Sequence, residues 1–200
     1  MKFIITSILV FLATISLYAQ SDKEFSKNVF SKEISFVRTD TAHGSQSTVI
    51  EYPTFLIVIE LPMIDEGGGR SSNLAQDIPK AERFLNYLKN EYNDKPVKYV
   101  LSSHWHLHSL SGITPFFNQG ATLIAAKTNW EYSVNNGLFD KTDTKAFEKQ
   151  VIQVSKDTII LENTDFPISV LFLDESYTHK PTRDYLFFYM PKNKCIHASC

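Results

Sequence analysis

The stretch that decides the fold is Val97-Lys-Tyr-Val-Leu-Ser-Ser103, followed by His104-Trp-His106-Leu-His108 and then by Ser109-Leu-Ser-Gly-Ile-Thr-Pro-Phe-Phe-Asn118. An apolar run typical of a β-strand precedes the three histidines, and a helix-like segment follows them. Alternate side chains of an extended chain point to the same side, so the three imidazoles can converge on one point. Zinc takes neutral histidine nitrogens, and a catalytic zinc site leaves one position open for water. The pattern predicts a metal site, with solvent-facing or hydrogen-bonded histidines as the alternative.

Length and composition are those of one globular domain without a strongly charged surface. The chain has 200 residues, of which 43% are hydrophobic, enough to form a packed core. The formal net charge is −2, and both signs are mixed along the sequence without a basic block. We therefore expect no nucleic-acid partner.

The first nineteen residues have the pattern of a targeting segment. Lys2 provides a positive charge, an apolar run from Phe3 to Leu17 follows, and Ala19 is a small residue suitable for cleavage after it. The apolar run is short and interrupted by Thr and Ser, so we expect no stable membrane anchor. The sequence predicts a signal peptide over residues 1–19 and a mature domain over 20–200, periplasmic or secreted if the source is bacterial.

The only two cysteines, Cys195 and Cys200, are not obvious disulfide partners. If the segment from Leu186 to Cys200 is a hairpin, both cysteines lie along one strand, with Cα atoms about 16 Å apart and side chains on opposite faces. A disulfide tolerates only about 4.4–6.8 Å between Cα atoms. An exported free thiol suggests another role, such as metal ligation, although Cys195 also fits a small buried hydrophobic position.

The rest of the sequence alternates between strand and helix patterns. The segment from Asn73 to Tyr92 has apolar residues at helical spacing, and we expect Asp77 to cap the main helix with Pro79 in its first turn. The preceding strand, Phe55 to Leu61, is apolar except for Glu60, which needs a partner or a surface exit. Further strands are predicted over 34–38, 47–52, 97–102, 121–126, 151–154, 158–162, 168–173, 185–190 and 195–200, helices over 112–119 and 128–136, and a loop with some helix over 138–150. This order favours an α/β or α+β layered sandwich.

The histidine stretch resembles the signature of the metallo-β-lactamase-fold hydrolases, and the resemblance covers nearly all of the chain after the targeting segment. The family pattern is H-x-H-x-D-H, or H-x-H-x-D-R in one subclass, followed by a Gly-Gly pair. His104, His106 and Gly112 match this pattern. The chain departs from it at His108, which stands at the aspartate position, and at Ser109, which stands at the next position.

Three other segments also resemble the family. Glu60 stands where the family has a strand-end aspartate. His179 resembles the histidine that completes the first zinc site, and in this chain a strand ending at Pro191 follows it, as in the family. Ala198-Ser-Cys200 resembles the Gly-Gly-Cys of the zinc β-lactamase subclass that uses a cysteine ligand.

Carried over position by position, the resemblance implies a first zinc site formed by His104, His106 and His179. The second site would contain Cys200, with His108 in place of the aspartate as metal ligand, proton acceptor and candidate catalytic residue. Because His108 has no fixed negative charge, we expect a weak second site, hence one zinc ion with room for a second. The family places a further ligand histidine and another strand and helix layer after this point. We therefore expect an α+β, four-layer αββα sandwich whose second half is incomplete in a C-terminally truncated chain.

The resemblance implies a zinc-dependent hydrolase in which zinc-bound hydroxide attacks a carbonyl group of a small acyl substrate. A β-lactam amide is one such substrate, which would make the protein an antibiotic-resistance enzyme, and lactonase or thioesterase activity in the same fold is the alternative. Glu60 would support a ligand histidine, and Trp105 would line the substrate site. The replaced aspartate indicates impaired activity, so a non-catalytic metal-binding protein also stays open. We expect a monomer.

Overall fold

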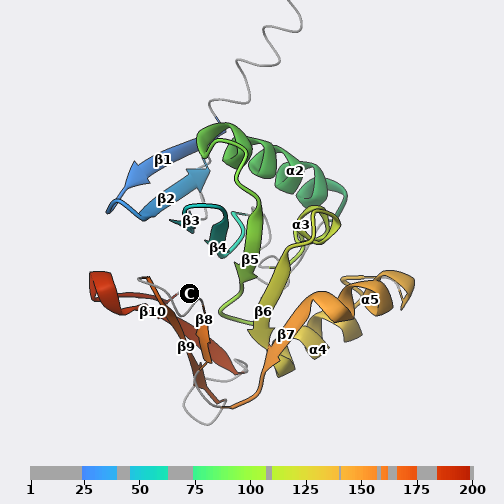
Figure 1. The fold of residues 1–200 in the computed structure, drawn as a ribbon. Helices are drawn as coiled ribbons and strands as arrows, with labels where there is room; N and C mark the ends of the chain where they lie inside the picture. Colours follow the sequence, from blue (N-terminus) through green and yellow to red (C-terminus); the bar gives the residue numbers. More distant parts are fainter. Residues whose placement is uncertain are drawn as a thin grey trace, which may run out of the picture.

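The computed structural model describes residues 24–39, 46–62, 74–106, 110–139, 141–156, 159–161, 166–174 and 184–198. Within these ranges the chain forms two β-sheets, with helices packed against the larger one (Figure 1). The larger sheet contains β1 (Phe25–Val29), β2 (Ile34–Thr39), β3 (Gln46–Glu51), β4 (Leu56–Ile59), β5 (Val97–Leu101), β6 (Thr122–Ala126) and β7 (Val151–Val154). The smaller sheet contains β8 (Ile159–Leu161), β9 (Ile168–Leu173), β10 (Tyr185–Met190) and β11 (Cys195–His197). The helices are α2 (Leu74–Glu91), α3 (Thr114–Asn118), α4 (Lys127–Asn135) and α5 (Lys141–Phe147), with short 3-10 turns η2 (Glu148–Gln150) and η4 (Pro191–Asn193).

The connections between strands explain the order of the larger sheet, β1-β2-β3-β4-β5-β6-β7. Strands β1 to β4 pair antiparallel, whereas β4 to β7 pair parallel. Parallel neighbours need a crossover connection, and helices provide it here: α2 joins β4 to β5, α3 joins β5 to β6, and α4 with α5 joins β6 to β7. The smaller sheet, in the order β11-β10-β9-β8, is antiparallel.

Strand β4 lies at the centre of the molecule and contributes to two apolar cores. Leu56 and Val58 belong to a core shared with α2 and α3, whereas Ile57 and Ile59 belong to a core shared with the smaller sheet. Alternate residues of a strand point to opposite faces, so a strand between two layers must be apolar at every position. All four side chains are fully buried, which confirms the predicted two-faced burial.

The predicted α+β layered sandwich is confirmed. The described residues form three successive layers, namely helices, the larger sheet and the smaller sheet (Figure 1). Every predicted strand is present and begins within a residue of its expected start. The region 138–150, expected to be a loop with some helix, is mostly helical, because α5 and η2 occupy it.

Two local features differ from the sequence prediction. The expected cap at Asp77 is wrong, because α2 already begins at Leu74 and Asp77 lies buried in its first turn. Pro79 therefore lies inside the helix. Because proline has no backbone N–H, one helical hydrogen bond near the start of α2 is absent. Strand β1 was not predicted, because only Phe25 of its five residues is buried; pairing with β2, rather than an apolar pattern, makes this edge segment a strand.

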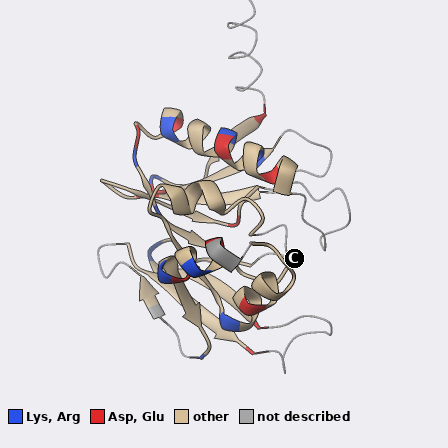
Figure 2. Ribbon diagram, turned by 90° about the vertical axis from the view of Figure 1, so that its right-hand side faces the viewer, with Lys and Arg blue, Asp and Glu red and all other residues tan. Residues whose placement is uncertain are grey.

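Helix α2 is amphipathic and covers one end of the larger sheet. Its buried face contains Ala81, Phe84, Leu85 and Leu88, all within the core shared with the sheet. Figure 2 shows that positively and negatively charged residues are both present along the same helix. Among the described residues, no helix is long and apolar enough to cross a membrane.

We predict that Phe84→Ala lowers the free energy of unfolding by about 3–5 kcal/mol, because it leaves a cavity between helix and sheet. The Phe84 ring is fully buried and lies 5.3 Å from the ring of Phe25 and 6.3 Å from that of Phe116, measured between centroids. Urea denaturation provides the measurement. The control is Glu82→Ala on the exposed face of α2, which should change stability by less than about 0.5 kcal/mol. Equal effects of the two substitutions would contradict the assigned core.

Candidate metal site

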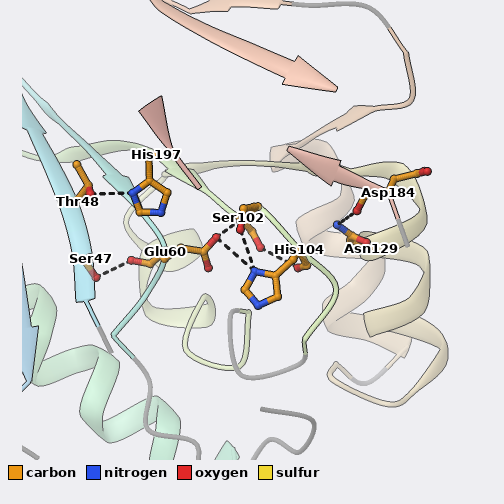
Figure 3. A network of polar contacts seen from close by, with 9 residues as sticks. Ser47, Thr48, Glu60, Ser102, His104, Asn129, Asp184 and His197 are labelled. Carbon is orange, nitrogen blue, oxygen red and sulfur yellow. Dashed lines mark hydrogen bonds and ion pairs between the residues drawn. The ribbon is translucent and has the colours of Figure 1, made fainter. Parts of the chain in front are cut away.

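The candidate site lies where β4 and β5 end. Ile59 of β4 pairs with Leu101 of β5 in parallel register, so the residues after both strands meet at one edge of the sheet. Glu60 follows β4 directly, and its N–H donates to the Leu101 carbonyl oxygen over 2.9 Å. Ser103 and His104 follow β5. Figure 3 shows the Glu60 carboxylate directed toward the segment that contains His104.

Glu60 has a backbone conformation that turns its side chain inward. Its φ of 60° lies in the left-handed region, which is uncommon for a residue other than glycine. The Ser47 hydroxyl donates to the Glu60 carbonyl oxygen over 2.6 Å and holds this turn. The carboxylate then accepts the Ser103 N–H over 2.6 Å. It also lies 3.8 Å from Nδ1 of His104.

The surroundings of Glu60 keep its carboxyl group ionised. Burial by itself raises the pKa of Glu60, but the positive charge of a protonated His104 nearby lowers it, as does hydrogen bonding from Ser103. The net result is a pKa of about 2, compared with an ordinary value of 4.5. A buried negative charge next to a candidate ligand histidine is therefore a fixed feature of the site at neutral pH.

His104 is held in one orientation from several sides. Its side chain is 3% exposed, and its Nδ1 lies 2.9 Å from the Ser103 hydroxyl. Its ring stacks on Tyr185 of β10, with centroids 6.0 Å apart and planes 14° from parallel. Because Nδ1 faces Ser103 and Glu60, Nε2 is the nitrogen that His104 can present to a metal ion. Histidine ligands in metal sites are commonly oriented in this way through their second nitrogen.

His106 lies beside His104, and Trp105 packs against His106. The ring centroids of His104 and His106 are 4.7 Å apart, with planes at 83°. The Trp105 indole also lies 4.7 Å from the His106 ring and 5.1 Å from the Tyr132 ring of α4, measured between centroids. Trp105 is 7% exposed, so most of its surface already contacts protein.

Three of the predicted site residues, His108, His179 and Cys200, lie outside the described residues. Within the described ranges, no group of three His, Cys, Asp or Glu side chains is close enough to hold a metal ion. The described half of the site contains two neighbouring imidazoles and one ionised carboxylate behind the first. This donor chemistry fits zinc, which binds neutral histidine nitrogens.

Cys195, whose thiol is free, is partly buried against the core between the sheets, in agreement with its hydrophobic interpretation.

The smaller sheet supports this loop through contacts that the sequence did not reveal. The backbone N–H of Leu186 in β10 donates to the Ser103 carbonyl oxygen over 2.8 Å and thereby links the two sheets at the site. At the start of β10, Asp184 accepts the Thr128 hydroxyl over 2.7 Å, and its carbonyl oxygen accepts the Asn129 amide over 3.0 Å (Figure 3). These bonds tie β10 to the first turn of α4.

Within the described residues, His197 of β11 is a further histidine near the site. Its Nδ1 lies 2.8 Å from the Thr48 hydroxyl of β3, so this contact joins the two sheets (Figure 3). Burial lowers the pKa of His197; the charge of Glu60 opposes this effect and that of His104 adds to it. From the sequence, only one feature indicated that His197 faces the space between the sheets. It lies two residues after Cys195 on the same strand, and alternate residues of a strand face the same side.

The comparisons with known proteins are structural only, because the sequence matches no protein-family model and no curated protein. A metallo-β-lactamase from Pontibacter korlensis aligns with a TM-score of 0.58 and 18% identity over 86% of this chain and 69% of its own. The metallo-β-lactamase IND-7 aligns with a TM-score of 0.64 and 16% identity, over 89% and 72% of the two chains. A metallo-β-lactamase from Hirschia baltica aligns with a TM-score of 0.59 and 14% identity, over 87% of this chain and 70% of its own. The chain therefore has the metallo-β-lactamase fold.

We predict that Glu60→Gln flattens the acid side of the stability profile of the metal-free protein. A folded-state pKa below the ordinary value stabilises the fold above about pH 4.5, and this contribution is lost as the pH falls toward 2. The ionised Glu60 therefore stabilises the folded protein at neutral pH by roughly 3 kcal/mol, at 1.36 kcal/mol per unit of pKa, and Glu60→Gln should lack this pH-dependent contribution. Urea denaturation from pH 2.5 to 7 measures it, with Glu82→Gln as the control. Parallel profiles of wild type and Glu60→Gln would contradict the assignment.

We also predict coupling between Thr48 and His197. Thr48→Val and His197→Phe should each destabilise the protein, while the double variant loses less than the sum, because both remove the same hydrogen bond. The coupling energy expected for one such bond is about 0.5–1.5 kcal/mol. A double-mutant cycle by urea denaturation measures it. Strict additivity of the two substitutions would show that the contact contributes nothing.

Proposed function

We propose that the protein is an exported zinc-dependent hydrolase of the metallo-β-lactamase superfamily that cleaves a small acyl substrate. The observation that carries this proposal is the buried, ionised Glu60 behind His104, with the His106 ring beside it. An orienting carboxylate and neighbouring imidazoles at the carboxyl ends of parallel strands form a suitable base for a metal centre. The fold shared with metallo-β-lactamases supports the same interpretation.

The proposed zinc ligands are His104 and His106, completed by His179 from the sequence pattern. When bound by three neutral imidazoles, zinc lowers the pKa of its water to near 7 and polarises a carbonyl group. A second, weaker site would use Cys200 and His108, as in the subclass with a cysteine ligand. We expect one zinc ion per chain under ordinary conditions, because the second site lacks the negative charge of the family aspartate.

The described residues have supporting roles in this proposal. Glu60 would compensate positive charge at the site and, with Ser103, keeps Nδ1 of His104 engaged, so that Nε2 would be the atom available to bind zinc. Tyr185 limits rotation of the His104 ring by stacking on it. Trp105 closes the site on the α4 side and excludes water there, since its indole contacts both His106 and Tyr132. Outside the described residues, His108 would ligate metal or accept a proton at the position of the family aspartate.

A β-lactam is the substrate class that the comparisons favour, because the similar structures carry the name metallo-β-lactamase. Lactones and thioesters contain the same reacting carbonyl group and are the alternative substrates. A second function, metal binding without turnover, is favoured by one observation: His108 replaces the aspartate of the family pattern. His108→Asp separates the two functions, because a gain in hydrolysis indicates an enzyme with a weakened site.

We predict close to one zinc ion per chain in the purified mature protein, together with measurable nitrocefin hydrolysis. His104→Ala and His106→Ala should each lower the zinc content to well below half and abolish turnover, because each removes a ligand. Atomic spectroscopy and absorbance of the same sample provide both values. His43→Ala, which changes a histidine outside the predicted ligand set, is the matched control.

Two outcomes distinguish a wrong substrate class from a wrong hydrolase proposal. Zinc binding without nitrocefin turnover would exclude the β-lactam substrate and direct the search to lactones and thioesters. Zinc content well below one per chain after metal loading, in a folded protein, would contradict the hydrolase proposal as a whole.

A further inference from the structure

A cavity of about 750 Å³ lies at the opposite end of the sandwich from the candidate metal site. Phe55, which precedes β4, lines the cavity, whereas Glu60, which follows the same strand, belongs to the metal site. Five residues of extended chain separate the two positions by about 16 Å. The cavity is therefore a distinct feature, and its volume lies within the roughly 300–1,000 Å³ typical of small-molecule sites.

Aromatic side chains from both sheets form the inner wall of this cavity. The Tyr52 and Phe55 rings stack with centroids 4.6 Å apart and planes 12° from parallel. Phe166, which precedes β9, lies edge-on to Tyr52 at 6.0 Å, and the Tyr52 hydroxyl donates to the Phe166 carbonyl oxygen. Tyr52 and Phe166 are each 5% exposed. The wall is thus apolar and already ordered.

Charged side chains at the mouth of the cavity favour an anion. Lys95 donates to Glu51 over 2.6 Å and to the Tyr52 carbonyl oxygen over 2.9 Å, and Lys192 donates to Glu33 over 2.9 Å. Both glutamates in the cavity lining are therefore already compensated.

Lys32 also lines the cavity and forms no ion pair within the described part of the chain. Three lysines face two glutamates, which leaves an excess of one positive charge. Each ammonium group has three donors, and Lys192, whose Nζ lies 5.6 Å from the Phe166 ring centroid, uses one of them on Glu33, so both lysines have donors to offer a ligand.

We propose that this cavity binds a small aromatic carboxylate, with its ring against Phe55 and Phe166 and its carboxylate between Lys32 and Lys192. A monoanion matches the single excess charge, and an aromatic body matches the apolar wall. A cationic ligand is disfavoured because the two carboxylates are occupied by lysines. This site is independent of zinc and of the proposed hydrolase activity.

The test uses 4′-fluorobiphenyl-4-carboxylate as the probe and fluorine NMR as the readout, with full-length mature protein in the presence of a chelator. We expect saturable binding to the wild type. Lys32→Met and Lys192→Met should each weaken binding by roughly fivefold or more, because each removes a charge-assisted hydrogen bond. The neutral carboxamide analogue of the probe should bind more weakly by a similar factor.

Lys194→Met is the matched control, because Lys194 is exposed and lies two residues from Lys192, but is not part of the cavity lining. It removes the same charge from the same region and should leave the affinity unchanged. Thermal unfolding confirms that each variant is folded. The proposal is overturned if the wild type shows no saturable binding, if Lys32→Met and Lys192→Met bind like the wild type, or if Lys194→Met loses as much affinity.

Discussion

The structure around the candidate site depends on one buried negative charge, the carboxylate of Glu60. An ionised carboxylate without partners would be strongly destabilising in the protein interior. The left-handed backbone at Glu60 turns the group inward, and Ser103 and His104 then compensate it. Because Ser103 and His104 lie just after β5, their contacts with the Glu60 carboxylate fix the backbone at the end of this strand. The same contacts orient the His104 imidazole.

The two sheets meet at this loop, and this explains why the sandwich and the site belong together. Leu186 of β10 bonds to the backbone of Ser103, and Tyr185 stacks on the His104 ring. On the other side, the Thr48–His197 contact joins β3 to β11. A helix layer, a two-faced central sheet and a second sheet therefore converge on the ends of β4 and β5, where the imidazoles lie.

The sequence predicted the fold well where burial imposed a pattern, and less well where pairing or tertiary contacts decided the structure. Strand β4 was recognisable from its apolar run and α2 from its helical spacing. Strand β1 has no recognisable apolar pattern because its residues are mostly polar, and Pro79 does not mark the start of α2, so Asp77 is not its cap. In the site, the pattern indicated His104 and His106, but no local pattern reveals that His197 contacts Thr48, 149 positions away.

The central claim is that the oriented imidazoles hold zinc. The most direct test is X-ray absorption at the zinc edge on mature protein loaded with one equivalent of zinc. The account predicts a four-coordinate ion with imidazole nitrogens at about 2.0–2.1 Å, and loss of the imidazole scattering in His104→Ala. A hydrated ion without imidazole scattering, or a spectrum unchanged by His104→Ala, would contradict it.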